Sequence, residues 1–321
     1  MGKILINIPD GDKRSFEQGI PAGEALQKLV ANKIRKQTVA VKVNGNPMDL
    51  SAPVVNDTVL EPITLDSDEG LDILRHSAAH IMALAVKQIF GDNVKVAIGP
   101  SIENGFYYDF DREEPFTPED FDKIENKMAE IVASRQPFIR TEIPIGEAEQ
   151  FFAQQGEKYK VELLQEMETD KVSFYRLGDF VDLCRGPHLP DSSWLKAFKL
   201  LRVAGSYWRG DENRPMLQRL YGTAFSDKKE LKKYLHQLEE ARKRDHRRLG
   251  KDLGLFTIQD QIGPGLILWQ PRGALLRRLI EDYWKDEHYR KGYELLYTPH
   301  IARQDLWKTS GHLDFYGENM Y

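Results

Sequence analysis

Residues 67–91 (SDEGLDILRHSAAHIMALAVKQIFG) decide much of the fold, because they carry the features of one long amphipathic helix. Ser67 favours the N-cap position, two acidic residues follow it in the first turn, and a Phe-Gly pair ends the periodic pattern. His76 and His80 are four residues apart, so they share one face of this helix, and we expect them to face a cleft. They lie beside an apolar stripe that we expect to face the core, formed by Leu71, Leu74, Ala78, Ile81 and Ala85.

A second short segment, residues 184–188 (CRGPH), supplies two further side chains of the ligand or acid–base type. A Gly-Pro pair breaks any helical path between its ends, so Cys184 and His188 belong to a loop that can lie opposite the histidine helix. The residues before the loop, 180–184, read as a strand, whose period of two places Asp182 and Cys184 on one face. The two segments together use three of the eight histidines and the single cysteine. We therefore predict one site.

Two chemical interpretations of this site stay open at the level of the residues. His76, His80, Cys184 and His188 form a four-ligand set that suits tetrahedral zinc. The same groups suit a metal-free hydrolytic pocket, in which a neutral imidazole activates water and other polar groups orient the substrate.

Composition bounds the class of protein. A chain of 321 residues is long enough for two or three domains, and 41% hydrophobic with 30% charged residues is ordinary for a soluble globular protein. No apolar run approaches the length of a membrane span, and the polar N-terminus does not resemble a signal peptide. One cysteine excludes an internal disulfide framework and fits a reducing compartment, so we expect a cytoplasmic protein.

The charge distribution is more informative than the net charge of −5. Residues 103–130 contain ten acidic and three basic residues, whereas residues 228–251 contain ten basic and four acidic ones. A segregated basic stripe can follow the phosphates of a nucleic acid, although a solvated helix face has the same pattern. The stripe consists of Lys228, Lys229, Lys232, Lys233, Arg242, Lys243, Arg244, Arg247 and Arg248.

The fold class that we predict is α+β with several domains. Residues 1–64 resemble a ubiquitin-like β-grasp unit: alternating Ile4, Ile6 and Ile8 indicate a strand, and a helix is expected over 22–34. Strands over 38–43 and 58–63 complete this unit, with Asn44-Gly45 as a turn.

Three further segments follow. Residues 65–225 are expected to form an α/β domain around the predicted site, with strands near 94–98 and 105–110 and helices near 118–134 and 146–155. Residues 226–250 are expected to form one basic connector helix. The rest, 251–321, contains a predicted helix over 273–290 and a strand that ends at Thr298-Pro299.

The order of motifs resembles that of bacterial-type threonyl-tRNA synthetases along the whole chain. The resemblance implies a TGS domain over 1–64, an editing domain over 65–225, and the start of a class II catalytic domain within 251–321. The helix near 273–290 resembles class II motif 1, which in that family lies at the dimer interface. The motifs are HSAAH, NGFYYD (104–109), YKVELL (159–164), DLCRGPH (182–188), WRGD (208–211), QRLYGTAF (218–225) and KRDHRRLGKDLGLF (243–256).

The resemblance also implies an activity and a set of site residues. Serine differs from threonine by one methyl group, which allows only about 10–200-fold discrimination, so such a synthetase hydrolyses mischarged seryl-tRNA at a second site. The residues that match the family's motif are assigned by role: His76, Lys160, Asp182 and Cys184 catalytic; His80, His188, Gly99 and Tyr108 substrate-binding; Arg242, Lys243, Arg244, Arg247 and Arg248 tRNA-binding. Spacing alone does not separate Lys160 from its neighbour Lys158. Cys184 can be a nucleophile in principle, but we favour attack by water.

Cofactors and partners follow from the same resemblance. Editing is expected to need no metal, with zinc at the His/Cys set as the alternative, and tRNA(Thr) is the expected partner. Motifs 2 and 3, the ligands of the synthetic zinc and the anticodon-binding domain have no counterpart before Tyr321. ATP, magnesium, zinc, threonine and homodimer formation are therefore expected of the full-length synthetase, of which this chain resembles the N-terminal half. Two rivals remain: a stand-alone esterase acting on mischarged tRNA, and a non-catalytic tRNA- or ribosome-binding protein.

Overall fold

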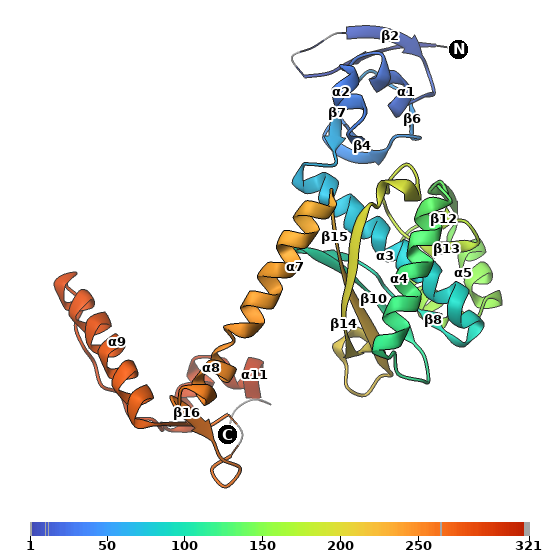
Figure 1. Cartoon of the computed structure of the whole chain (residues 1–321). Coiled ribbons are helices and arrows are strands. Elements are labelled where there is room, and N and C mark those ends of the chain that lie inside the picture. Colours follow the sequence, from blue (N-terminus) through green and yellow to red (C-terminus); the bar gives the residue numbers. More distant parts are fainter. Residues whose placement is uncertain (1, 10, 12, 264, 318–321) are drawn as a thin grey trace. The chain divides into compact units, whose positions relative to one another are not determined.

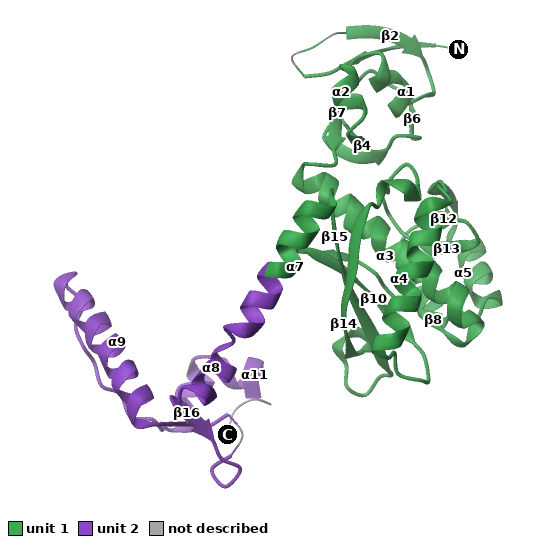
Figure 2. Ribbon diagram, viewed as in Figure 1, with its two compact units in different colours: residues 1–236 green, residues 237–321 purple. Residues whose placement is uncertain are grey.

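The computed structural model describes residues 2–9, 11, 13–263 and 265–317. The chain divides into two compact units, residues 1–236 and 237–321 (Figure 2). The domain boundaries predicted at 64/65, 225/226 and 250/251 would divide the chain into more parts than these two units, and they stay predictions.

The N-terminal part of the first unit forms its own five-stranded sheet, in the order β2-β1-β7-β4-β5 (Figure 1). β1 pairs in parallel with β7, and the other neighbours are antiparallel. Asn44 and Gly45 have φ of 51° and 83°, as a type I′ hairpin turn requires, and they join β4 to β5. The strands are β1 (Lys3–Asn7), β2 (Lys13–Glu17), β4 (Thr38–Val43), β5 (Asn46–Asp49) and β7 (Thr58–Thr64), with a separate pair β3 (Ile20–Pro21) and β6 (Pro53–Val54).

The helix predicted over 22–34 is wrong in its continuity. Two short helices, α1 (Ala22–Gln27) and α2 (Asn32–Arg35), replace it. Between them the chain turns so that Leu29 enters the same core as Leu26, beneath Ile6 and Leu60 of the sheet. Burial of that leucine outweighs the small gain from extending one helix.

The helix predicted around the two histidines is confirmed as α3 (Asp68–Phe90). The Ser67 hydroxyl accepts the Gly70 N–H at 3.1 Å, which satisfies one free donor of the first turn. α3 packs with α4 (Pro118–Ala133) over a second sheet, in the order β14-β15-β10-β8 with β9 beside β10 (Figure 1). The strands of this sheet are β8 (Lys95–Val96), β9 (Ser101–Ile102), β10 (Gly105–Asp111), β14 (Ala197–Tyr207) and β15 (Met216–Phe225).

A third, three-stranded antiparallel sheet positions the loop of the predicted site. Its order is β11 (Ile139–Pro144), β12 (Lys171–Leu177) and β13 (Phe180–Leu183). Two helices lie next to it in the chain, α5 (Ile145–Gln154) and α6 (Lys158–Gln165). α6 was not predicted from the sequence, and it carries Lys160.

The second unit contains short elements and one long helix. The connector predicted as one helix is two, α7 (Lys228–Lys243), which the unit boundary crosses, and α8 (His246–Asp252). The break has a local cause, since the Asp245 side chain caps α8 by accepting the Arg247 N–H. The remaining elements are β16 (Phe256–Ile258), β17 (Ile267–Trp269), α9 (Pro271–Arg290), α10 (Gln304–Thr309) and α11 (His312–Tyr316).

The strand predicted to end at Thr298-Pro299 is wrong: the described backbone over 293–299 forms no strand. A strand needs a neighbour to complete its hydrogen bonds, and β16 and β17 pair with each other within the part of the chain that is described. No helix among the described residues is long and apolar enough to cross a membrane.

Candidate active site

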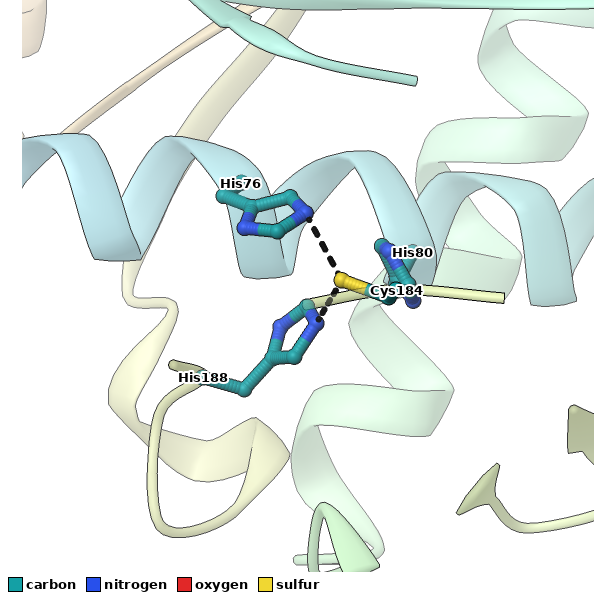
Figure 3. A group of neighbouring side chains, drawn as sticks. All are labelled: His76, His80, Cys184 and His188. Atoms are coloured by element: carbon teal, nitrogen blue, oxygen red, sulfur yellow. Dashed lines mark hydrogen bonds between the residues drawn. The ribbon is translucent and has the colours of Figure 1, made fainter. Parts of the chain in front are cut away.

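The helix and the loop that were predicted to form one site do meet in space. His76 and His80 project from adjacent turns of α3 toward Cys184, which follows β13, and His188 approaches from the other end of its loop (Figure 3). The Cys184 sulfur lies 3.3 Å from Nε2 of His76 and 3.3 Å from Nε2 of His188. One donor atom from each of the four side chains lies within 4.8 Å of every other.

Local geometry folds the loop back on itself. Gly186 has φ of 70°, a left-handed conformation that favours glycine, and its N–H points at the Cys184 sulfur at 3.3 Å. A side chain at this position has no room, because a Cβ would lie 1.9 Å from the Tyr175 hydroxyl oxygen. The Gly186–Pro187 peptide bond is cis.

His188 is fixed from several directions. Its Nδ1 lies 3.0 Å from the Ser77 hydroxyl of α3, which also accepts the Leu189 N–H at 3.0 Å. Its ring stacks on Phe138, with centroids 4.7 Å apart. The imidazole is therefore held in one orientation beside the cysteine.

A buried ion pair forms the second part of the site. Lys160 and Asp182 are each 2% exposed, and the Lys160 ammonium contacts Oδ1 of Asp182. The Tyr108 hydroxyl donates to Oδ2 of Asp182 at 2.6 Å and accepts from Lys160 Nζ at 3.1 Å. Nε2 of His80 lies 3.5 Å from the same Oδ2, so the ion pair and the imidazole cluster are in contact.

The structure separates the two lysines that spacing could not. The Lys158 side chain is 60% exposed, pairs with Asp111, and does not line the site. Lys160 lies two residues further along α6, on the side that faces Asp182. The choice of Lys160 agrees with this geometry.

Burial controls the charge states in the site. It lowers the pKa of His80 to about 3, although the Asp182 carboxylate opposes this, and it lowers the pKa values of His76 and His188 too. Burial, with the nearby Asp182 charge, raises the pKa of the Cys184 thiol to about 12. Burial alone raises the pKa of Asp182, but the Lys160 cation and the hydrogen bonds hold it below its ordinary value. The three imidazoles and the Cys184 thiol are therefore neutral, and the ion pair consists of the Lys160 ammonium and the Asp182 carboxylate.

A cavity of about 990 Å³ opens over these groups. Such a volume is at the upper end of sites for small molecules. Its wall includes His76, His80, Gly99, Lys160, Asp182 and Cys184.

Tyr108 does not line the cavity, which corrects its expected role. Its side chain is fully buried and packs directly beneath Gly99, where a Cβ would lie 2.0 Å from the Tyr108 ring. The tyrosine therefore supports the floor under Gly99 and orients Asp182, rather than touching a ligand. His188 is also outside the wall, behind Cys184, at 1% exposure.

Part of the site lies in a stretch of sequence that matches a known family model. Residues 172–221 match the model described as the threonyl and alanyl tRNA synthetase second additional domain. That stretch runs from β12 into β15 and contains Asp182, Cys184 and His188.

Similarity to whole proteins extends over the chain. Threonine–tRNA ligase of Syntrophotalea carbinolica is 52% identical over 322 residues, which cover 100% of this chain and 50% of the relative. The corresponding values are 51% over 324 residues, 100% and 50%, for Citrifermentans bemidjiense, and 52% over 313 residues, 97% and 48%, for Nitratidesulfovibrio vulgaris Miyazaki F. The chain is therefore similar over its whole length to threonine–tRNA ligases, at about 50% identity. It spans about half the length of the curated relatives that it matches.

Asp49 is a member of the site that sequence reasoning missed. It ends β5 of the N-terminal sheet, yet its Oδ1 accepts the His188 N–H at 2.9 Å and its Oδ2 accepts the Tyr175 hydroxyl at 2.5 Å. These partners are 139 and 126 residues away in the sequence, so no local pattern announces the contact. The loop that carries Cys184 and His188 is thus held partly by the first sheet.

The basic residues that were assigned to tRNA binding are exposed but mostly paired. Four of the five form ion pairs with carboxylates within about one helical turn: Lys243 with Glu239, Arg244 with Glu240, Arg247 with Asp245, and Arg248 with Asp252. Within the described residues, Arg242 has no ion pair.

The donor set fits zinc chemically. Three imidazoles and one thiol can approach a common centre. Asp182 lies beside His80, where a carboxylate can orient a histidine that binds a metal. Such an ion would be held by His76, His80, Cys184 and His188. With all four side chains bound, the ion would be structural; with three bound, the open position would take a water whose pKa the ion would lower.

Proposed function

We propose that this chain hydrolyses the ester of serine with tRNA(Thr), through water and without a metal. The observation that carries the proposal is the cavity lined by neutral imidazoles and the Lys160–Asp182 pair. Its support is the match of residues 172–221 to the second additional domain of threonyl and alanyl tRNA synthetases.

The reaction follows from roles that the geometry supports. Water attacks the ester carbonyl while His76, the least buried of the three imidazoles, accepts its proton. The Lys160 ammonium stabilises the oxyanion that develops on the carbonyl oxygen, and Asp182 and Tyr108 hold the ammonium in place. The bond from the carbonyl carbon to the ribose oxygen then breaks, and that oxygen takes the proton from His76. Serine and free tRNA are the products.

The remaining side chains shape the site. Cys184 as a neutral thiol is a poor nucleophile, which favours attack by water. His80 and His188 hold Cys184 and Asp182 in position, and Gly99 keeps one wall of the cavity free for the adenosine.

The domain assignment belongs to the same proposal. The mixed sheet of residues 1–64, with its central parallel pair, supports a β-grasp TGS domain. Residues 65–225 would be the editing domain, 226–250 the basic connector, and 251–321 the start of a class II catalytic domain. We infer that the full-length synthetase charges tRNA(Thr) with threonine as a homodimer that uses ATP, magnesium and one further zinc.

One experiment tests the activity against its rivals. The chain is incubated with seryl-tRNA(Thr) and threonyl-tRNA(Thr), with and without a zinc chelator, and ester loss is followed over time. We expect fast, serine-selective hydrolysis that the chelator does not change. Loss of activity with the chelator indicates the zinc site, and tRNA binding without hydrolysis indicates a non-catalytic module. Comparing the rate of ester hydrolysis by this chain with that of its longer relatives tests whether the chain acts alone as an esterase on mischarged tRNA.

A further inference from the structure

Two cations at the rim of the cavity have no role in the mechanism above. Arg185 belongs to the 184–188 loop and Lys171 begins β12, and both line the cavity that contains His76 and Lys160. Both residues are exposed, whereas Lys160 is 2% exposed. The cavity therefore has one ammonium in its depth and two positive charges at its entrance.

Neither rim cation is neutralised. In the part of the chain that the structure describes, no carboxylate pairs with the Arg185 guanidinium or the Lys171 ammonium, and neither side chain makes a hydrogen bond. By contrast, Arg244, Arg247 and Arg248 near the junction of α7 and α8 each pair with a carboxylate. Two glutamates also line this cavity: Glu166 is engaged by Arg209, and Glu168 is the one carboxylate of the described wall that could oppose the two cations without another ion pair.

Arg185 also borders a second, smaller cavity of about 190 Å³, whose wall includes Arg140. Arg140 pairs with Glu142, so Arg185 is the cation that the walls of the two cavities share. A chain of phosphates needs spaced positive charges, whereas an isolated amino acid ester does not.

We propose that Arg185, assisted by Lys171, binds the 5′-phosphate of the terminal nucleotide that carries the amino acid. The inference rests on the proposed function, because it takes an aminoacyl ester as the ligand. With the ester beside His76 and Lys160 in the depth, the nucleoside occupies the middle of the cavity and its phosphate reaches the rim. Arg185 presents a planar fork that matches phosphate oxygens, and it is linked to Cys184 by one peptide bond.

A minimal pair of substrates isolates the phosphate. The hydrolysis of 3′-O-seryl-adenosine is compared with that of 3′-O-seryl-adenosine 5′-monophosphate, which differs only by the phosphate. We expect wild-type protein to prefer the phosphorylated ester by about tenfold in kcat/KM, as one charged hydrogen-bonded contact supplies. The double variant Arg185→Gln/Lys171→Gln is expected to lose this preference while it still hydrolyses seryl-adenosine at the wild-type rate.

The matched control is Arg176→Gln. Arg176 is an exposed arginine on the same strand, β12, but it lines neither cavity, so its loss should leave the preference intact. Equal hydrolysis of both esters by wild-type protein, or an unchanged preference in the double variant, overturns the phosphate site and leaves the hydrolase standing.

A binding measurement separates this inference from the proposed function. The amide analogues of the two esters cannot be hydrolysed by the same route, and their affinities are measured by calorimetry. Tighter binding of the phosphorylated analogue that disappears in the double variant supports the phosphate site, even when the protein hydrolyses neither ester. Equal affinity of the two analogues overturns it.

Discussion

The Lys160–Asp182 pair and the ion pairs of α7 and α8 use similar charges in opposite environments. The first pair is 2% exposed at both residues and is further bound by Tyr108 and His80. The basic helices also contain pairs of exposed side chains on neighbouring turns, such as Lys243 with Glu239. An exposed pair contributes about 0–1 kcal/mol, whereas removing one partner of a buried pair costs about 3–5 kcal/mol. Burial, not charge, therefore separates the ion pairs on which folding stability depends from those that contribute little to it.

The largest effect is expected from Asp182→Asn, which attacks the buried half of this comparison. It leaves the Lys160 ammonium without its carboxylate, so the free energy of unfolding should fall by about 3–5 kcal/mol and hydrolysis of seryl-tRNA by about a thousandfold or more. Urea denaturation and a deacylation assay measure the two quantities.

The matched control is Lys158→Met. Lys158 lies on α6, as Lys160 does, but it is exposed and pairs with Asp111. The substitution should change the free energy of unfolding by less than about 1 kcal/mol. The double variant Lys160→Met/Asp182→Asn should be more stable than Asp182→Asn, because it leaves no buried unpaired ammonium. Equal losses from Asp182→Asn and Lys158→Met would contradict the contrast between buried and exposed pairs.

Asp49→Ala should have the next largest effect on activity. It removes the acceptor of the His188 N–H and of the Tyr175 hydroxyl, so the loop with Cys184 is less well fixed. Loss of positioning should reduce deacylation by about 10–100-fold, by analogy with small misplacements in other active sites. Tyr175→Phe removes one of the two bonds and should give a smaller loss. An Asp49→Ala protein with wild-type deacylation would show that the loop holds its shape alone.

The burial of His80 should also give the stability a pH dependence. The folded-state pKa of His80 is about 3, below its ordinary 6.5, so on acidification the unfolded chain binds this proton first. Stability is then fully present above pH 6.5 and is lost as the pH falls from 6.5 toward 3, by about 1.4 kcal/mol per pH unit for one histidine. Denaturation with a chelator present should show this slope, and His80→Asn should reduce it.

The sequence predicted the parts of the fold whose signals are local. Each of these signals lies within a few neighbouring residues: the cap at Ser67, the spacing of His76 and His80, and the Gly-Pro break at 186–187. The split after Gln27 and the break at Asp245 were missed, because core packing and a side-chain cap decided them against the periodic pattern.

The site was predictable to the same limit. The meeting of α3 with the 184–188 loop followed from residue types, but Asp49 lies on another sheet and has no motif of its own. Tyr108 was assigned to substrate binding from the family's motif, and a motif does not say whether a tyrosine faces a cavity or lies beneath its floor, where the structure places it. Tertiary contacts over more than a hundred residues supply this information, and one sequence does not contain it in readable form.

The smallest effects are expected on the exposed side of the comparison. Arg242→Gln should leave the free energy of unfolding within about 0.5 kcal/mol of wild type, because an exposed side chain without an ion pair is removed. If the basic stripe contacts tRNA, the variant binds more weakly and the slope of log affinity against log salt becomes shallower by about 0.7–0.9. Arg247→Gln is the informative companion, since it removes the same charge but also frees Asp245, whose carboxylate then repels phosphate. A larger loss of tRNA affinity for Arg247→Gln than for Arg242→Gln would place phosphates near α8, whereas unchanged affinity and slope in both would make the stripe a solvated helix face.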